Sequence, residues 1–185
     1  MKKWIAFFSQ TGTEIVDIAE SLGRWPDMII TNERPDHVRT INPELLSKKV
    51  FTLPNKPSLE DYYNILEGFE KEDTFISLHG WLRVMPGEIC EEYFILNGHP
   101  GLITEYPELK GKDPQIRAYQ GIVEGKYTMA GTVIHTVTAG VDEGPIREIE
   151  AFSVDSKLSL DELFRILRER SLDMWARTIK KVLND

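Results

Sequence analysis

The sequence predicts an open α/β fold with a mostly parallel central sheet, helices on both faces, and an antiparallel portion in the C-terminal half. Three short apolar runs, WIAFF, MIIT and TFISL, have the length and composition of buried strands. Stretches with helical spacing separate these runs, which predicts a parallel sheet with right-handed crossovers. Two longer runs joined by TAGVDEG are typical of an antiparallel pair. No linker interrupts the 185 residues, so we expect a single domain over 1–185.

The first quarter of the chain alternates strand and helix. Residues 4–8 are the first predicted strand, and residues 28–31 the second. The helix between them ends at Gly23 and carries one apolar face, formed by Ile15, Ile18, Ala19 and Leu22. The stretch 32–55 contains several helix and strand breakers, so we expect irregular structure there with one short strand at 50–52.

The next helix is predicted to begin at Ser58, with Asp61 three residues later as its capping partner. Its apolar residues are Tyr62, Ile65, Leu66 and Phe69. Residues 74–78 and 93–96 follow as short buried strands.

The C-terminal part is expected to differ in topology. Residues 129–137 and 145–154 have the pattern of two longer antiparallel strands. Ser159 and Glu162 form a capping-box pattern at the start of the last helix. Its apolar stripe consists of Leu163, Phe164, Leu167, Leu172, Trp175, Ile179 and Val182.

Composition narrows the classes of function. The net charge of −8 argues against a nucleic-acid partner, because binding a phosphate backbone depends on Lys and Arg. The single Cys90 predicts a reducing, cytoplasmic location, and the apolar runs are too short for a membrane span. No metal site is expected. A group of basic residues near the C-terminus is expected to be a solvated helix face rather than a phosphate site: Arg165, Arg168, Arg170, Arg177, Lys180 and Lys181.

Asn97 and His99 stand at the end of the strand predicted over 93–96. Strand periodicity places them on the same face, roughly 6–7 Å apart. The carboxyl end of such a strand is where open α/β sheets bind ligands, and Pro100 ends the pairing. An amide beside an imidazole suits a developing oxyanion, whereas the alternative is a polar strand end with His99 bonded to the backbone.

Three other stretches contain polar groups whose role the residues alone leave open. Asp142 lies between glycines in a tight turn, where it would serve its own backbone or orient His99. The segment 79–86 is either core or the wall of a cleft for a flat ligand. The turn at 9–13 lacks a dinucleotide or Walker signature. His37 and His135 are expected to be structural histidines.

The order of these motifs resembles one family. NGHPG at 97–101, AGTVIHTVTAGVDEGPI at 130–146 and GWLRVMP at 80–86 are similar to the motifs of the N10-formyltetrahydrofolate-dependent formyltransferases. The similarity is specific over 79–146 and looser from FFSQTGTE to the last helix. Within this family the chain looks most like the glycinamide ribonucleotide formyltransferases and shares features with the nucleotide-sugar N-formyltransferases. The resemblance implies a Rossmann-like formyltransferase fold.

The resemblance also implies a set of site residues. Asn97, His99 and Asp142 match the catalytic trio. The donor, N10-formyltetrahydrofolate, would be bound by residues that match the walls of the pterin site: Leu82, Arg83, Val84, Met85, Thr138, Ala139, Gly140 and Val141. Three residues, Gly12, Thr13 and Pro100, are assigned to the acceptor side.

The implied reaction is formyl transfer from the folate to the primary amine of a small acceptor, through a tetrahedral intermediate stabilised by Asn97 and His99 with Asp142 assisting. The acceptor is left open between glycinamide ribonucleotide, in purine biosynthesis, and an amino-sugar nucleotide. In the glycinamide ribonucleotide enzymes the position of Glu14 is usually Asn, and a carboxylate there is unfavourable for a phosphate. The alternatives are a formyltetrahydrofolate hydrolase and a non-catalytic folate or nucleotide binder. The oligomeric state stays open, with a homodimer as one option.

Overall fold

The computed structural model describes residues 2–33 and 40–184, and the strands of these residues form one seven-stranded sheet. The strands are β1 (Lys3–Phe8), β2 (Met28–Asn32), β3 (Val50–Leu53), β4 (Thr74–His79), β5 (Phe94–His99), β6 (Met129–Thr136) and β7 (Ile146–Ser153). The helices are α1 (Thr13–Leu22), α2 (Pro43–Leu46), α3 (Leu59–Leu66), α4 (Gly87–Glu92), α5 (Pro114–Val123) and α6 (Leu160–Asn184), with a 3₁₀ turn, η1, at Pro107–Leu109.

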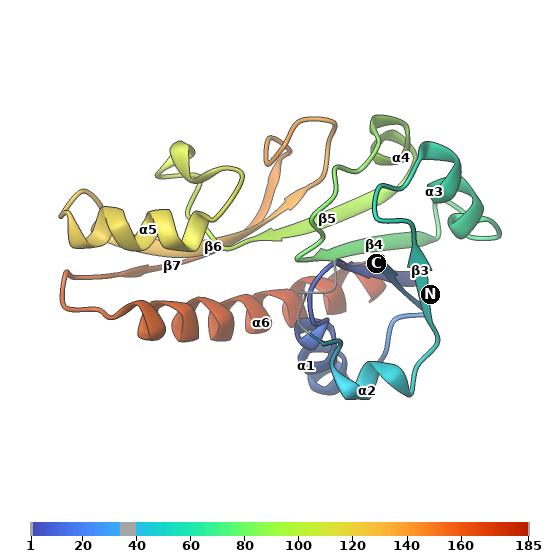
Figure 1. The fold of residues 1–185 in the computed structure, drawn as a ribbon, viewed down its shortest axis with the longest axis horizontal. Helices are drawn as coiled ribbons and strands as arrows, with labels where there is room; N and C mark the ends of the chain where they lie inside the picture. The colour runs from blue at the N-terminus through green and yellow to red at the C-terminus, as the bar shows by residue number, and fades with distance from the viewer. Residues whose placement is uncertain (1, 34–39, 185) are drawn as a thin grey trace.

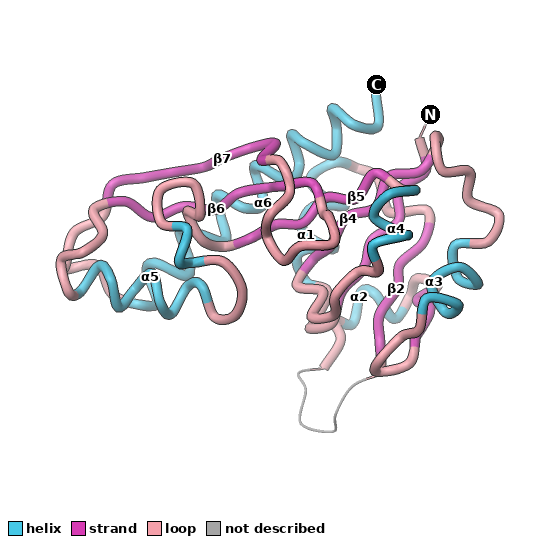
Figure 2. The backbone as a smooth tube through the Cα atoms, turned by 90° about the horizontal axis from the view of Figure 1, so that it is seen from above, coloured by secondary structure: helices cyan, strands magenta, loops and turns pink. Residues whose placement is uncertain are grey.

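The strand order is β3-β2-β1-β4-β5-β6-β7. Strands β1 to β5 pair in parallel, and β6 pairs antiparallel with both β5 and β7. This topology confirms the predicted parallel sheet with an antiparallel C-terminal portion. Figure 2 shows β6 and β7 running side by side away from the other strands.

Helices cover both faces of the sheet, as the fold prediction requires. In Figure 1, α1, α2 and α6 lie below the sheet, and α3, α4 and α5 lie above it. Along β1, Ala6 and Phe8 pack into the core between the sheet and the helices α1 and α6, whereas Ile5 and Phe7 pack into the core on the side of α3 and α4. This alternation buries both faces of the central strands and explains why they read as unbroken apolar runs.

The predicted elements with strong apolar patterns are present. The capping boxes at Ser58 and Ser159 are both formed, with Asp61 and Glu162 as the reciprocal partners. The basic residues of α6 pair with carboxylates, since Arg168 contacts Asp17 and both Arg170 and Arg177 contact Glu150. These ion pairs confirm the prediction of a solvated helix face.

The sequence reading omitted three short helices. α2 lies inside the stretch expected to be irregular, and it is capped by the Asn42 side chain, which accepts a hydrogen bond from the Glu44 amide. α4 begins directly after Pro86, and α5 begins at Pro114 with proline in its first turn. The prediction for His37 concerns a residue outside the described ranges.

Candidate active site at the carboxyl end of β5

The end of β5 places two polar side chains on one face of the sheet. Asn97 lies beside Leu78 of β4 and opposite His135 of β6, and His99 ends the strand two residues later. The strand stops before Pro100, as predicted, and the Gly101 amide bonds back to the His99 carbonyl at 2.9 Å. This end of β5 also adjoins the carboxyl ends of β1 and β4, where open α/β sheets bind ligands.

His99 is held from both ring nitrogens and is almost completely buried. Its Nδ1 lies 3.2 Å from the Asp142 Oδ2 atom, and its Nε2 donates to the Leu109 carbonyl at 2.9 Å. The hydroxyl of Thr132 donates to the His99 carbonyl at 3.1 Å and fixes the backbone as well. The imidazole therefore has one orientation, with Nδ1 facing a carboxylate.

Asp142 joins two histidines. Its Oδ2 accepts a hydrogen bond from the Gly111 amide at 2.8 Å, and its Oδ1 lies 3.2 Å from His135 Nε2. The residue has φ 53°, the left-handed conformation that aspartate tolerates in a tight turn. The turn between β6 and β7 thus delivers the carboxylate to His99, which was the open question at Asp142.

His135 belongs to this group, although the sequence reading treated it as structural. Its Nδ1 donates to the Thr136 carbonyl at 3.0 Å, and its Nε2 lies 3.1 Å from the Asn97 side-chain amide. The side chain is 3 % exposed. The missing signal was the register of β6, because His135 pairs directly with Asn97 in the antiparallel ladder.

Burial and hydrogen bonding shift the pKa values of the two central groups. Burial alone would raise the pKa of Asp142, but the His135 side chain, the Gly111 amide and the His99 charge together lower it. Burial lowers the pKa of His99, and this effect exceeds the opposing influence of Asp142 and the Leu109 carbonyl. The contacts of the site thus favour the ionised form of Asp142, whereas burial disfavours the charged form of His99.

The loop around η1 supports both groups. Arg117 of α5 donates to the Leu109 carbonyl at 3.0 Å and to the Lys110 carbonyl at 2.7 Å. This loop supplies the carbonyl that meets His99 and the Gly111 amide that meets Asp142. Arg117 thus positions the loop that orients the imidazole and the carboxylate.

Two segments with exposed apolar side chains lie beside this group. In the segment after β4, Trp81 and Met85 are buried, whereas Leu82 is 61 % and Val84 is 70 % exposed. In the turn after β6, Val141 is 58 % exposed. A Cβ atom on Gly87 would lie 3.5 Å from Ala139, so the two segments approach each other.

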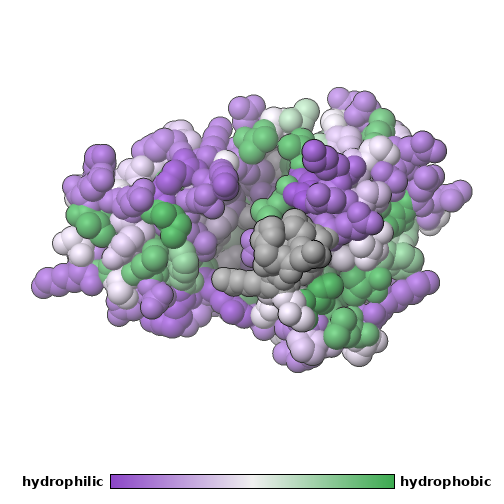
Figure 3. Space-filling model, in the orientation of Figure 1, coloured by the Kyte–Doolittle hydropathy of each residue, from purple (hydrophilic) through white to green (hydrophobic). Residues whose placement is uncertain are grey.

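The apolar side chains and the main chain between these segments have the chemistry of a flat-ligand site. Figure 3 shows hydrophobic residues grouped at the upper edge of the molecule, next to the recess between its two halves. The segment 81–86 is neither helix nor strand, and the Leu82 amide bonds to Ser9 Oγ at 3.0 Å. Arg83 is tied to Asn55 and to the Leu82 carbonyl rather than to the group around His99. In the turn, the Thr138 hydroxyl reaches the Gly140 carbonyl at 3.5 Å.

The residues predicted to bind the acceptor lie at the start of α1 and directly after β5. Gly12 has φ 71° and is buried, because a Cβ atom there would meet the Leu45 side chain of α2 at 2.3 Å. Thr13 begins α1 and is half-buried, as is Pro100.

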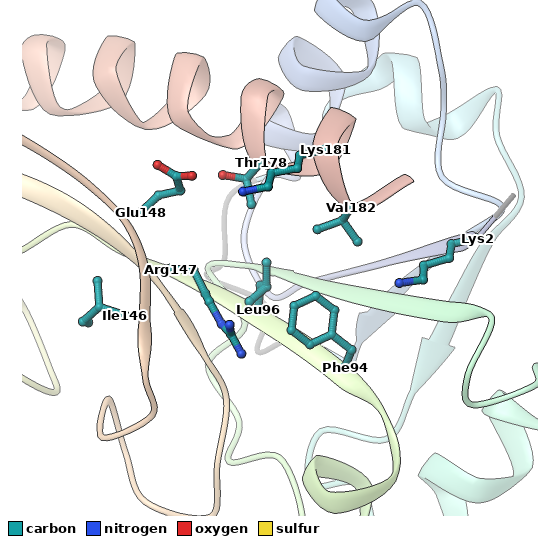
Figure 4. Close-up of a pocket in the computed structure, with 9 residues that line it drawn as sticks. All are labelled: Lys2, Phe94, Leu96, Ile146, Arg147, Glu148, Thr178, Lys181 and Val182. Carbon is teal, nitrogen blue, oxygen red and sulfur yellow. The ribbon is translucent and has the colours of Figure 1, made fainter. Parts of the chain in front are cut away.

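A separate cleft of ≈ 520 Å³ lies away from this group, at the starts of β5 and β7 and the end of α6 (Figure 4). It contains none of the predicted site residues. Its lining consists of Lys2, Phe94, Leu96, Ile146, Arg147, Glu148, Thr178, Lys181 and Val182. Within residues 2–33 and 40–184, no group of three or more His, Cys, Asp or Glu side chains is arranged to hold a metal ion. No helix in the same ranges is long and apolar enough to cross a membrane.

The sequence profile described as "Formyl transferase" matches residues 37–179, most of the chain. The chain belongs to the formyl transferase family. This membership confirms the family that the sequence motifs predicted.

Curated relatives within the formyl transferase family include two phosphoribosylglycinamide formyltransferases. The protein from Bacillus subtilis (strain 168) is 27% identical over 114 residues, which cover 60% of this chain and 55% of the relative. The protein from Schizosaccharomyces pombe is 30% identical over 99 residues, which cover 49% of this chain and 46% of the relative. The chain spans about half the length of the curated relatives that it matches.

Solved structures of phosphoribosylglycinamide formyltransferases share the fold. The structure from Geobacillus kaustophilus has a TM-score of 0.79 at 20% identity, covering 99% of both chains. The structure from Bacillus Halodurans has a TM-score of 0.77 at 22% identity, covering 98% of this chain and 95% of that chain. A formyltetrahydrofolate deformylase from Pseudomonas syringae has a TM-score of 0.75 at 18% identity, covering 100% of this chain and 62% of that chain. The likeness confirms the Rossmann-like formyltransferase fold.

Proposed function

We propose that this member of the formyl transferase family transfers a formyl group from N10-formyltetrahydrofolate to the primary amine of a small acceptor. The observation that carries the proposal is the group formed by Asn97, His99, His135 and Asp142 at the carboxyl end of β5. An ionised carboxylate beside two imidazoles and an amide suits a reaction in which an oxyanion develops and a proton moves.

The donor fits the two apolar segments next to this group. The exposed side chains of Leu82, Val84 and Val141 offer apolar contact area for a flat pterin ring. The main chain of 81–86 is not part of the sheet, so its N–H and C=O groups can bond to the edge of the pterin. When bound, the donor supplies an activated formyl group on its N10 atom. The site residues on this side are Leu82 to Met85 and Thr138 to Val141, and their assignment stays a prediction.

Hydrogen-bond accounting orients Asn97 for the reaction. His135 Nδ1 donates to the Thr136 carbonyl, and its Nε2 lies 3.1 Å from the Asn97 side-chain nitrogen. The Asn97 NH₂ group donates one of its two hydrogens to His135 Nε2 and leaves the other for an oxyanion.

The proton path uses the same carboxylate. The amine of the acceptor loses a proton as it attacks, and the folate nitrogen gains one as it leaves. Asp142, whose lowered pKa favours the ionised form, takes the amine proton and returns it to the departing folate nitrogen, so the protons balance. Because both ring nitrogens of His99 face the Leu109 carbonyl and Asp142 in the free site, the His99 N–H that donates to the oxyanion must turn from one of these partners to the substrate. Removing His99 should lower turnover by about 10²- to 10³-fold.

The decisive experiment incubates the protein with formyl donor and each candidate amine, and follows tetrahydrofolate release by absorbance. Glycinamide ribonucleotide and an amino-sugar nucleotide are the two acceptors to compare. His99→Ala should lower the rate of release by about 10²- to 10³-fold while folate affinity, measured by fluorescence titration, stays within about twofold, since the apolar walls remain intact. Folded protein that releases no tetrahydrofolate with any amine would refute the transferase proposal.

A formyltetrahydrofolate hydrolase is the second candidate, because the deformylase from Pseudomonas syringae shares this fold. Water would then take the place of the amine at the same group of residues. Formate production without any acceptor, at a rate equal to that with the best amine, would favour the hydrolase.

A further inference from the structure

Glu14 is held in a chain of buried hydrogen bonds on the acceptor side of the sheet edge. Its Oε2 lies 2.8 Å from His79 Nδ1, and its Oε1 accepts from the Ser171 hydroxyl at 3.0 Å. The other imidazole nitrogen of His79 lies 2.8 Å from Ser77 Oγ, to which the Trp4 indole donates at 2.8 Å. These contacts join β1, α1, β4 and α6 through five side chains.

The direction of each bond in this chain follows from its members. The Trp4 N–H can only donate, so the Ser77 oxygen accepts from it. The Ser77 hydroxyl is fully buried and donates to the only acceptor among its two partners, Nε2 of His79. With this arrangement His79 Nδ1 donates its hydrogen to the Glu14 carboxylate.

Glu14 is fixed but still accessible. Its side chain is 32% exposed, whereas the side chain of His79 is 1% exposed. Two donors hold the carboxylate in place, and its remaining lone pairs are open to a ligand. A carboxylate held in this way accepts hydrogen bonds from hydroxyl or ammonium groups and repels a phosphate.

Several amides at the start of α1 are already hydrogen-bonded. The Thr13 amide bonds to Thr11 Oγ1 at 3.3 Å, and the Ile15 and Val16 amides both bond to the Gly12 carbonyl. Asn42 covers the same turn, bonding to Thr13 Oγ1 at 3.4 Å. A phosphate at this turn would therefore compete for the Thr13, Ile15 and Val16 amides and lie near the carboxylate of Glu14.

The Glu14 chain lies directly across the sheet from the proposed reaction site. His79 ends β4, and its ring packs against Trp175 with centroids 4.7 Å apart. Trp175 in turn packs against Gly98, where a Cβ atom would lie 2.6 Å from the indole nitrogen. Gly98 is the residue between Asn97 and His99. Because His79 and Gly98 lie at the carboxyl ends of neighbouring parallel strands, Glu14 is held at the same sheet edge as the proposed reaction site, where open α/β sheets bind ligands.

We infer that Glu14, positioned by His79 and Ser171, selects as acceptor a polyhydroxylated primary amine, such as an amino sugar. The hydroxyl groups of this acceptor face the Glu14 carboxylate, and the acceptor places no phosphate monoester at the turn before α1. The inference rests on the proposed formyl transfer and names its acceptor class. Glu14 is the residue that touches the acceptor, and His79 and Ser171 act through it.

The test uses acceptor pairs that differ only in a phosphate: glycinamide ribonucleoside against its 5′-phosphate, and glucosamine against glucosamine 6-phosphate. Wild-type protein should show a higher kcat/KM for the member without phosphate in at least one pair. Glu14→Gln should lower that kcat/KM by about 10- to 100-fold, as expected for a lost hydrogen bond to a charged group. The same variant should raise kcat/KM for the phosphorylated member, because the repulsion is gone.

Two further variants separate recognition from folding. Glu20→Gln makes the same charge change near the other end of α1, on an exposed side chain, and should leave both acceptors unaffected. Ser171→Ala should move selectivity in the same direction as Glu14→Gln by a smaller factor, since it removes one of the two donors.

The outcomes for the two proposals are distinguishable. Robust tetrahydrofolate release with a preference for the phosphorylated member of both pairs, unchanged in Glu14→Gln, would overturn the acceptor class and leave formyl transfer standing. Absence of release with every amine would instead refute formyl transfer itself.

Discussion

Replacing Asp142 with Asn tests the central link of the proposed active site. The carboxylate, 9% exposed, accepts a hydrogen bond from the Gly111 amide and lies 3.2 Å from a ring nitrogen of both His99 and His135. Asn has nearly the same shape and also tolerates φ 53°, so the backbone of the turn should persist. The variant thus removes the charge and one acceptor atom without adding backbone strain.

The magnitude follows from the bonds that change. Hydrogen bonds to a charged group contribute about 1.5–3 kcal/mol and neutral ones about 1 kcal/mol. The side chain of the Asp142→Asn variant would keep two of the three contacts, each with the strength of a hydrogen bond between neutral groups, and would lose the third. Part of this loss is offset because the variant no longer buries a charge. We expect a net loss of about 2 kcal/mol in the free energy of unfolding, or about 4–8 °C in Tm for a domain of this size. Turnover should fall by about 100-fold, because His99 loses the partner that stabilises its charged form.

Denaturation and tetrahydrofolate release measure the two effects, with Asp113→Asn as the matched control. Asp113 also has a left-handed backbone, φ 52°, but its side chain is 65% exposed and its nearest cation is 3.9 Å away. The lowered pKa of Asp142 means that its stabilisation is full above about pH 4 and is lost as pH falls through the lower folded value. The stability gap between wild type and Asp142→Asn should therefore persist at pH 5. Equal stability and turnover in the two Asn variants would refute the assigned role.

Two other substitutions test neighbouring contacts. Gly98→Ala should cost about 1–3 kcal/mol in the free energy of unfolding, because the added Cβ lies 2.6 Å from the Trp175 indole, and Trp175→Phe should restore part of it in chemical denaturation. An unchanged unfolding midpoint in Gly98→Ala would contradict this packing. His135→Gln should lower kcat by about 10- to 100-fold with little change in folate affinity, since it removes the group that orients Asn97. A normal kcat in His135→Gln would show that Asn97 is oriented by other means.

The fold was largely predictable because its central strands are buried on both faces. Strands such as β1 and β4 appear as unbroken apolar runs, and α1 and α6 each have an apolar stripe. The helix α4 was missed because its six residues are too few for a clear period, and α5, although as long as α1, was missed because its proline start was not used as a signal. Their start signals, a proline in or before the first helical turn, were present in the sequence.

The candidate site was predictable only in part. Asn97 and His99 follow from strand alternation, but their link to Asp142 depends on the turn that bridges β6 and β7, which local sequence does not specify. His135 was assigned a structural role because a histidine inside a strand usually bonds within the sheet. The antiparallel register that faces it toward Asn97 is a long-range property. The Glu14 chain depends on contacts among α1, β4 and α6, and only the fold brings these together.

The alternation of β5 explains how one strand can serve two substrates. Asn97 and His99 face the side of the apolar walls, whereas Gly98 between them faces α6 and lets Trp175 approach the strand. Trp175 packs against His79, and His79 holds Glu14. The position of Glu14, the proposed acceptor residue, therefore depends on Gly98, which has no side chain and lets Trp175 pack close to β5. Under the proposed function the amine and the formyl carbon must come within about 3–3.5 Å of each other. Both faces of the sheet share the end of β5, so we expect a larger residue at Gly98 to displace Trp175 and, through it, His79 and Glu14, while Asn97 and His99 stay in place.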